Sequence, residues 1–145
     1  MKKLIALLVL SIPFMSYCET PHPAKWTYKV EEKKDGEAEL IFNVKLDQHW
    51  HIYSQFTPDG GPLPLVFTFN PLTCYSLEGK VSEPKPIEEY DSSFEMKVLY
   101  FEKEVEFRQM VKLNKKSCSI KGKIEYQACK EACIFLDTIF TLKIE

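Results

Sequence analysis

The C-terminal stretch SIKGKIEYQACKEACIFLDTIFTLKI, residues 119–144, decides the fold class. Apolar residues alternate with polar ones along 120–128 and again along 134–144. This period of two is typical of a β-strand with one buried face. The two runs are separated by CKEAC, residues 129–133, and three residues between the cysteines are a permitted hairpin loop. The stretch therefore predicts an antiparallel hairpin whose two cysteines face each other at its closed end.

The alternation also predicts which way the two cysteines point. Cys129 shares a face with Gln127, and Cys133 shares a face with Asp137, so both lie on the more polar side of their strands. At the end of a hairpin the two Cα atoms come close enough for a disulfide. We expect that disulfide to point toward solvent, where the thiolate of another protein reaches it.

Three roles are open for this pair on the residues alone. The ring that the bridge closes is small, and chain entropy gives about 2 kcal/mol for it, against about 4 kcal/mol for a loop from Cys74 to Cys118. A structural disulfide and a redox-active disulfide remain equally good interpretations. A zinc site needs four ligands, and nothing in the sequence brings His49 and His51 to the cysteines. We expect neither a metal nor a cofactor.

Alternating runs continue through the rest of the chain. The other predicted strands lie at 25–31, 38–46, 49–56, 64–70, 74–81, 94–101 and 104–113. Turn residues separate these runs, and the proline-rich piece 84–90 is predicted to be a loop within the domain. No helical apolar stripe is present after residue 20. Eight or nine short strands predict an all-β, immunoglobulin-like antiparallel β-sandwich.

The first residues have the pattern of a signal peptide. Lys2 and Lys3 precede the apolar run 4–14, which is too short to span a bilayer. We expect a signal peptide at 1–18 and one domain at 19–145, exported, with lipidation of Cys18 as the alternative. Without the two lysines, 17 basic residues face 21 acidic ones, and no basic patch is present, so nucleic acid is not an expected partner.

The order of several motifs carries a family resemblance. The segments HWHIYSQ, GGPLPLVFTF, YSLEGKVSEP, DSSFEMKVLYFEKEVEF and GKIEYQACKEACIFL resemble the N-terminal periplasmic domain of DsbD, a transmembrane thiol–disulfide reductase. The resemblance covers roughly residues 25–145. It implies an immunoglobulin-like fold, a redox-active Cys129–Cys133 pair and the periplasm of a Gram-negative bacterium. It implies as partners thioredoxin-like proteins, a membrane electron conduit and periplasmic acceptors. We expect separate proteins to load and unload electrons.

The resemblance also implies which residues surround the pair. A cap loop that shields the cysteines in that family matches DSSFE, with Phe94 as the shielding ring, and the HIY segment matches a strand near the pair. By analogy, Cys133 is expected to form the intermolecular bond. The expected site residues are Cys129, Cys133, Asp91, Ser92, Ser93, Phe94, Glu95, His51, Tyr53 and Tyr126. The three-residue spacing between the cysteines is shorter than in the best-known members.

Purely structural roles are also open for several of these residues. Phe94 shares a parity with the apolar residues at 96, 98 and 100, which is also the pattern of a core residue. His51 and Tyr53 also fit surface positions on a strand. Cys74 and Cys118 fit a structural disulfide, free thiols, or a bond from one of them to Cys18.

The rival function is a non-catalytic, exported immunoglobulin-like binding module with an inert disulfide, anchored through Cys18 if that residue is lipidated. A third option is an adaptor that only positions a redox partner. The residues alone leave open whether the chain is an enzyme.

Overall fold

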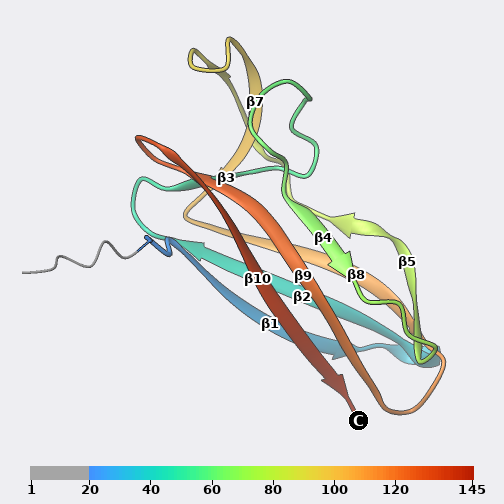
Figure 1. Ribbon diagram of the computed structural model, residues 1–145. Coiled ribbons are helices and arrows are strands. Elements are labelled where there is room, and N and C mark those ends of the chain that lie inside the picture. The colour runs from blue at the N-terminus through green and yellow to red at the C-terminus, as the bar shows by residue number, and fades with distance from the viewer. Residues whose placement is uncertain (1–19) are drawn as a thin grey trace, which may run out of the picture.

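The computed structural model describes residues 20–145, so the predicted signal peptide at 1–18 lies outside the described residues (Figure 1). Two antiparallel sheets pack face to face. One holds, in spatial order, β1 (Ala24–Glu32), β2 (Glu37–Leu46), β8 (Glu104–Leu113) and β5 (Tyr75–Ser82). The other holds β10 (Cys133–Ile144), β9 (Cys118–Cys129), β3 (His51–Tyr53), β7 (Met96–Glu102) and β6 (Ile87–Asp91), with β4 (Val66–Phe69) paired to β9 beside β3.

This arrangement confirms the predicted all-β, antiparallel sandwich. A short 3-10 turn, η1 (Lys34–Gly36), joins β1 to β2. Between the edge strands β1 and β10, the Tyr28 hydroxyl lies 3.0 Å from Thr138 Oγ1 and links the two sheets. Within residues 20–145, no helix has the length and apolar character needed to cross a bilayer.

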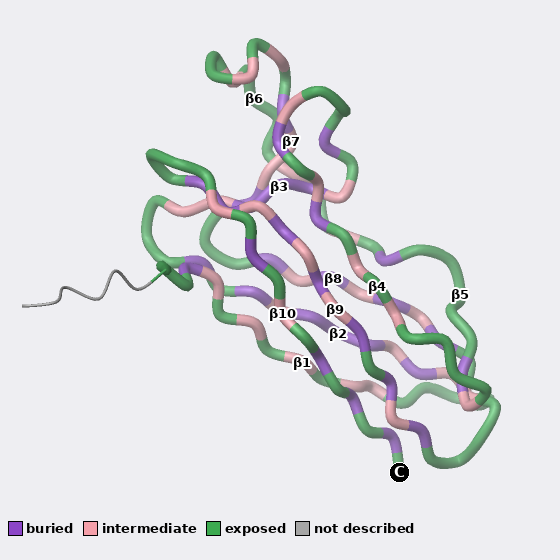
Figure 2. Tube along the Cα trace, in the orientation of Figure 1, coloured by how far each residue is buried: buried purple, intermediate pink, exposed green. Residues whose placement is uncertain are grey.

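Strand alternation decides what lies in the core (Figure 2). Every even-numbered residue of β9 from Cys118 to Ala128 is buried, as the sequence pattern predicts. Facing side chains of β2 and β10 complete the core, and the rings of Phe42 and Phe140 meet edge to face with centroids 4.9 Å apart. The buried faces of the two sheets therefore form one continuous apolar layer.

Gly122 marks the closest approach in this layer. It pairs with Phe69 of β4 and lies under the ring of Phe140. A Cβ at this position would overlap both the Thr68 carbonyl oxygen and the Phe140 ring. Only glycine lets β4, β9 and that aromatic ring pack together here.

Two predicted boundaries were wrong, and each has a physical reason. The run 49–56 is a strand only at His51–Tyr53, because His49 has a left-handed backbone with φ 69° and the chain turns after Ser54. That turn is held by hydrogen bonds from the Ser54 hydroxyl and the Gln55 amide to the Glu83 carboxylate. The predicted loop 84–90 contains β6, an exposed strand that pairs only with β7 and shows no apolar alternation.

The β6–β7 hairpin projects beyond the end of the sandwich, beside the loop that joins β3 to β4 (Figure 1). Its base is fixed, because β7 pairs with β3 and then passes through one residue, Lys103, into β8 of the opposite sheet. The closed end of the β9–β10 hairpin lies at the same end of the molecule. The fold thus brings the tips of two hairpins and one long loop together around the two C-terminal cysteines.

Candidate functional site around the Cys129–Cys133 disulfide

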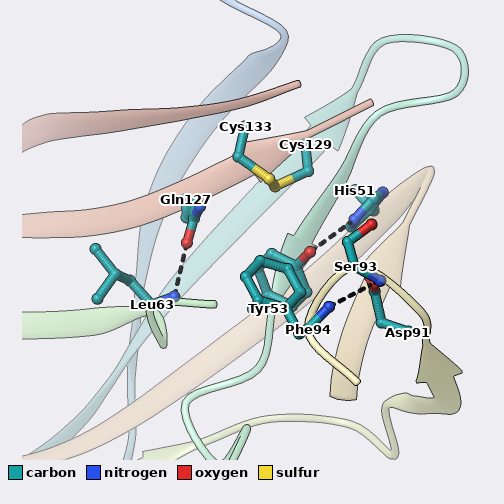
Figure 3. The surroundings of a disulfide bond; sticks show 9 residues. All are labelled: His51, Tyr53, Leu63, Asp91, Ser93, Phe94, Gln127, Cys129 and Cys133. Atoms are coloured by element: carbon teal, nitrogen blue, oxygen red, sulfur yellow. Dashed lines mark hydrogen bonds between the residues drawn. A yellow bond between two sulfur atoms is a disulfide. The ribbon is translucent and has the colours of Figure 1, made fainter. Parts of the chain in front are cut away.

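Cys129 ends β9 and Cys133 begins β10, and the two residues are directly opposite each other in the ladder. Their Cα atoms are 4.1 Å apart and their sulfurs form a disulfide (Figure 3). The three-residue loop between them is closed by a hydrogen bond from the Lys130 amide to the Ala132 carbonyl, 3.2 Å long. The hairpin predicted from the sequence is therefore confirmed.

The two sulfur-bearing residues differ sharply in exposure. Both lie on the face of the sheet opposite the core, as their parity predicts, but Cys129 is only 3% exposed while Cys133 is exposed. The prediction that both point toward solvent was wrong for Cys129. Its strand neighbour on that face is His51 of β3, and the β6–β7 hairpin folds over it. Tertiary packing, which strand parity does not report, covers one cysteine and leaves the other open.

A small apolar cluster, separate from the main core, covers Cys129. Its buried members are Cys129, Tyr53 and Val98, and Phe94, Met96 and Tyr100 pack against them. Tyr53 is 1% exposed, so the alternative view of this residue as a surface position was wrong. The Phe94 ring meets the Tyr53 ring edge to face, with centroids 6.4 Å apart. Phe94 thus packs on Tyr53 and not in the main core.

The structure shows where the apolar residues that share a parity with Phe94 lie. The side chains at 96, 98 and 100 do share one face, and that face covers Cys129. Met96, Val98 and Tyr100 were not expected in the site, although their shared spacing with Phe94 was the signal that could have identified them. The period of two correctly grouped these residues but could not tell which apolar cluster they join.

The tip of the β6–β7 hairpin, residues 91–96, is held by Asp91. Its Oδ1 accepts hydrogen bonds from the Ser93 amide at 2.7 Å and from the Phe94 amide at 3.3 Å. Glu95 then adopts a left-handed backbone with φ 55° and returns the chain to Met96, which pairs with Asp91. A side-chain oxygen that accepts from amides two and three residues later is a common way to fix a tight turn. Asp91 therefore sets the position of the Phe94 ring.

His51 lies between two tyrosines on the outer side of the cluster. Its Nε2 is 3.2 Å from the Tyr53 hydroxyl, and its ring centroid is 5.2 Å from that of Tyr100. Burial lowers the pKa of His51, although the carboxylates of Glu102, Asp91 and Glu89 oppose this effect. The neutral imidazole is therefore favoured, and it can accept a hydrogen bond from Tyr53.

Both tyrosines stay protonated at ordinary pH. Burial, with a smaller effect from the Asp91 charge, raises the pKa of Tyr53 to about 12. The pKa of Tyr100 is also raised to about 12, chiefly because its hydroxyl donates a 2.7 Å hydrogen bond to Glu89. Beside these groups lies a cleft of about 380 Å³ that is lined by His51, Tyr100, Glu89, Asp91 and Glu102. One side of the disulfide is thus acidic and rich in hydroxyl groups.

The other side of the disulfide is formed by the loop between β3 and β4. The Leu63 amide donates a 2.6 Å hydrogen bond to the Gln127 side chain, whose strand neighbour on β10 is Phe135 (Figure 3). The same loop packs against the hairpin tip, because a Cβ on Gly61 would touch Met96 Sδ. This loop was not expected in the site, and its length and composition gave no signal for it.

Three residues that the sequence analysis considered, Tyr126, Cys74 and Cys118, lie away from the Cys129–Cys133 pair. Tyr126 lies on the opposite face of β9, and its ring packs in the core 5.5 Å from Trp26, so it is no part of the surroundings of the pair. Cys74 and Cys118, whose state the sequence left open, form a second disulfide with Cα atoms 5.6 Å apart. That bond joins Cys74, the residue directly before β5, to Cys118, the first residue of β9 and the end of that strand far from Cys129.

A metal interpretation finds no ligand set in the part of the chain that the structure describes. Among residues 20–145, no three His, Cys, Asp or Glu side chains are placed to hold one ion. His49 is exposed in its left-handed turn, whereas His51 faces the tyrosines. Both C-terminal cysteines are already bonded to each other. The chemistry available at this site is that of a disulfide with one open and one covered sulfur.

Comparisons with known proteins agree with this picture. Over residues 19–144 the sequence matches the family described as thiol:disulfide interchange protein DsbD, N-terminal. The N-terminal periplasmic domain of ScsB from Proteus mirabilis has a TM-score of 0.62 at 17% identity. That match covers 93% of this chain but 49% of the ScsB domain, so the chain spans about half of its length.

Two structures from Neisseria meningitidis are similar as well. The reduced DsbD N-terminal domain has a TM-score of 0.54 at 18% identity, covering 83% of this chain and 90% of that one. The DsbD N-terminal domain in complex with the PilB N-terminal domain has a TM-score of 0.50 at 18% identity, covering 80% of each chain. At such identities the structural likeness supports the fold. No curated protein matches the sequence significantly.

Proposed function

Because the chain belongs to the family of DsbD N-terminal domains, we propose that it is an exported domain that exchanges thiols and disulfides through Cys129 and Cys133. The observation that carries this proposal is the contrast between the open Cys133 and the covered Cys129. A purely structural bridge gains nothing from one accessible sulfur. A bridge that must be attacked by another protein needs one.

The proposed exchange begins at Cys133. A thiolate of the partner attacks the Cys133 sulfur, a mixed disulfide forms, and the electron pair of the broken bond leaves with Cys129 as a thiolate. A second partner thiol then displaces Cys133, so the partner becomes a disulfide and this domain becomes a dithiol after taking up two protons. Delivery to an acceptor is the reverse, with Cys133 as attacking thiolate and Cys129 as resolving thiol. The exposure of the two cysteines supports this order.

The cap has a defined part in this proposal. Phe94, held over Tyr53 by the Asp91 turn, limits access to Cys129 from the β6–β7 side. It thereby protects the pair from small oxidants and thiols until a partner docks. Asp91, Ser92, Ser93 and Glu95 build the turn, and His51 with Tyr53 forms its floor.

The proposed partners are thioredoxin-like proteins on one side and a membrane electron conduit or periplasmic acceptors on the other. The complex of a related DsbD N-terminal domain with the PilB N-terminal domain supports protein partners. The periplasmic ScsB domain supports an exported location. The periplasm of a Gram-negative bacterium fits both, and no cofactor is required because the two cysteines carry the electrons themselves.

Redox titration tests the proposal. The protein is equilibrated in glutathione buffers, free thiols are alkylated, and intact mass reports how many cysteines were reduced. We expect one pair, Cys129–Cys133, to titrate while Cys74–Cys118 stays oxidised. A Cys129→Ser variant should capture a thioredoxin-like protein through Cys133, whereas Cys133→Ser should capture much less. A pair that stays oxidised below about −300 mV, together with no capture, would leave only the structural role.

A further inference from the structure

A group of exposed apolar side chains lies beside the open cysteine, on the outer face of β10 and across β9 on β4 and the loop that precedes it. We define the apolar flank as Leu63, Val66, Phe135 and Ile139. These side chains are 52%, 44%, 56% and 73% exposed, respectively. Single exposed apolar residues are ordinary, but a group of large ones on one face marks an interaction surface.

Strand register places the apolar flank on the same face as the disulfide. Cys133, Phe135 and Ile139 have the same parity on β10, so all three project from the outer face of the sheet. Phe135 follows Cys133 by two residues, which is about 6.7 Å along a strand. Val66 pairs with Glu125 of β9, so it projects from that outer face too. Leu63 reaches the same face through its hydrogen bond to Gln127, the residue opposite Phe135.

The chemistry of disulfide exchange fixes the side from which a partner arrives. An attacking thiolate approaches in line with the bond it breaks, opposite the sulfur that leaves. When Cys133 is attacked, the leaving sulfur is that of Cys129, which lies toward His51 and the cap (Figure 3). The thiolate must therefore arrive over β10, the edge strand, where Phe135 is exposed. The partner then covers Phe135 and the neighbouring part of the apolar flank, and not the acidic cleft.

The flank and the cleft differ in charge, which indicates the partner's chemistry. The cleft carries Glu89, Asp91 and Glu102. Within the flank, Lys123 and Glu125 of β9 lie between Ile139 and Val66, and Lys123 Nζ is 2.8 Å from Glu125 Oε1, so that pair of charges is satisfied within the chain. Asp137 is the one acidic residue between Phe135 and Ile139 on the outer face of β10. A surface of this kind suits a partner whose reactive cysteine is surrounded by apolar side chains.

We propose that the apolar flank, with Phe135 as its anchor, is the docking surface for the thioredoxin-fold protein that attacks Cys133. This inference rests on the proposed function and adds to it the face and the residues that recognise the partner. An exposed aromatic ring at the centre of a contact is a frequent source of binding energy in protein interfaces.

The test compares two reductants of different size. Reduced thioredoxin and dithiothreitol each reduce the oxidised protein, and the second-order rate constant for loss of Cys129–Cys133 is measured for both. For Phe135→Ser we expect the thioredoxin rate constant to fall about tenfold, as for loss of a central interface residue. The dithiothreitol rate constant should not change, because a small thiol needs no docking surface. Leu72→Ala, at an exposed leucine in the loop after β4, is the matched control and should change neither.

Each possible result supports or contradicts either the docking surface or the proposed function. An unchanged thioredoxin rate constant in both Phe135→Ser and Leu63→Ala overturns the docking surface while the proposed function stands. Equal loss of both rate constants assigns Phe135 to the disulfide's own geometry and also overturns it. A wild-type protein that thioredoxin reduces no faster per thiol than dithiothreitol refutes the proposed function itself. If Phe135→Ser instead abolishes self-association seen by sedimentation, with thioredoxin unaffected, the occupant of the flank is a second copy of this chain.

Discussion

The His51 Nε2 atom lies 3.2 Å from the hydroxyl oxygen of Tyr53, and both rings belong to β3, two residues apart on one face. This contact joins a half-buried imidazole to a fully buried phenol directly beneath the cap. Because burial lowers the pKa of His51, the native protein favours its neutral form. The interaction therefore links a titratable group to the packing around Cys129.

Native stability should fall on mild acidification because of His51. Its pKa is depressed in the folded protein, so the unfolded chain takes up the proton first, near pH 6.5. The stabilisation is complete above that pH and is lost as the pH falls through the folded pKa. In urea titrations from pH 7.5 downward, His51→Gln should show a flatter decline in unfolding free energy than the wild type. His22→Gln, at an exposed histidine, is the control, and equal slopes in all three proteins would contradict the prediction.

Removing the ring of Phe94 should open Cys129 to small thiols. In Phe94→Ala, we expect dithiothreitol to reduce the disulfide severalfold faster, because the ring no longer limits access over Tyr53. Loss of the edge-to-face pair should also cost about 1 kcal/mol of stability. Stopped-flow reduction and urea unfolding measure the two effects. Tyr90→Ala, on the same hairpin at an exposed position, should leave the reduction rate unchanged, and no acceleration in Phe94→Ala would remove the shielding role.

Gly122→Ala should destabilise the fold strongly. The added methyl group would meet the Thr68 carbonyl oxygen and the Phe140 ring, neither of which can move without disturbing β4 or the core. Overpacking of this kind costs about 2–3 kcal/mol. Urea denaturation of the oxidised protein measures the loss. Ser119→Ala, on the outer face of the same strand, serves as control, and a change of similar size in both would point to a general effect of the strand.

The two disulfides should contribute very differently to stability. The bond between Cys74 and Cys118 spans 44 positions, so its loss should cost about 4 kcal/mol by chain entropy. The Cys129–Cys133 bond spans only 4 and should cost about 2 kcal/mol. Unfolding free energies of Cys74→Ala/Cys118→Ala and Cys129→Ala/Cys133→Ala give the comparison. A larger loss in the second variant would mean that the C-terminal bond is mainly structural.

Much of this molecule follows from patterns of period two. The alternation along β9 and β10 correctly predicted the hairpin, its three-residue loop and the face on which Cys129 and Cys133 lie. Burial on one side of a sheet imposes that pattern, so it can be read back from the residues. Conversely, β6 is an edge strand that covers little of the core, and its residues carry no such pattern.

The site was less accessible to sequence reasoning than the fold. Burial of Cys129 depends on Tyr53, Val98 and the β6–β7 hairpin, which are distant in the chain and meet only in the folded protein. The family resemblance indicated Phe94 and Tyr53, yet it also pointed to Tyr126, which the opposite parity sends into the core. The loop contact between Leu63 and Gln127 involves a backbone amide, which any residue type supplies.

The single residue that separates β7 from β8 has a consequence for timing. Lys103, with φ 64°, turns the chain from one sheet directly into the other, and its carbonyl accepts a 2.7 Å hydrogen bond from the Leu46 amide. The base of the β6–β7 hairpin cannot swing without breaking both sheets, so any uncovering of Cys129 is confined to the tip at 91–96. Loop movements of that size take nanoseconds to microseconds, whereas hinge motions of whole domains take up to milliseconds. Uncovering of Cys129 is therefore expected to be much faster than the encounter of two proteins. The cap limits which molecules reach Cys129, but its opening is not expected to limit the rate of electron transfer.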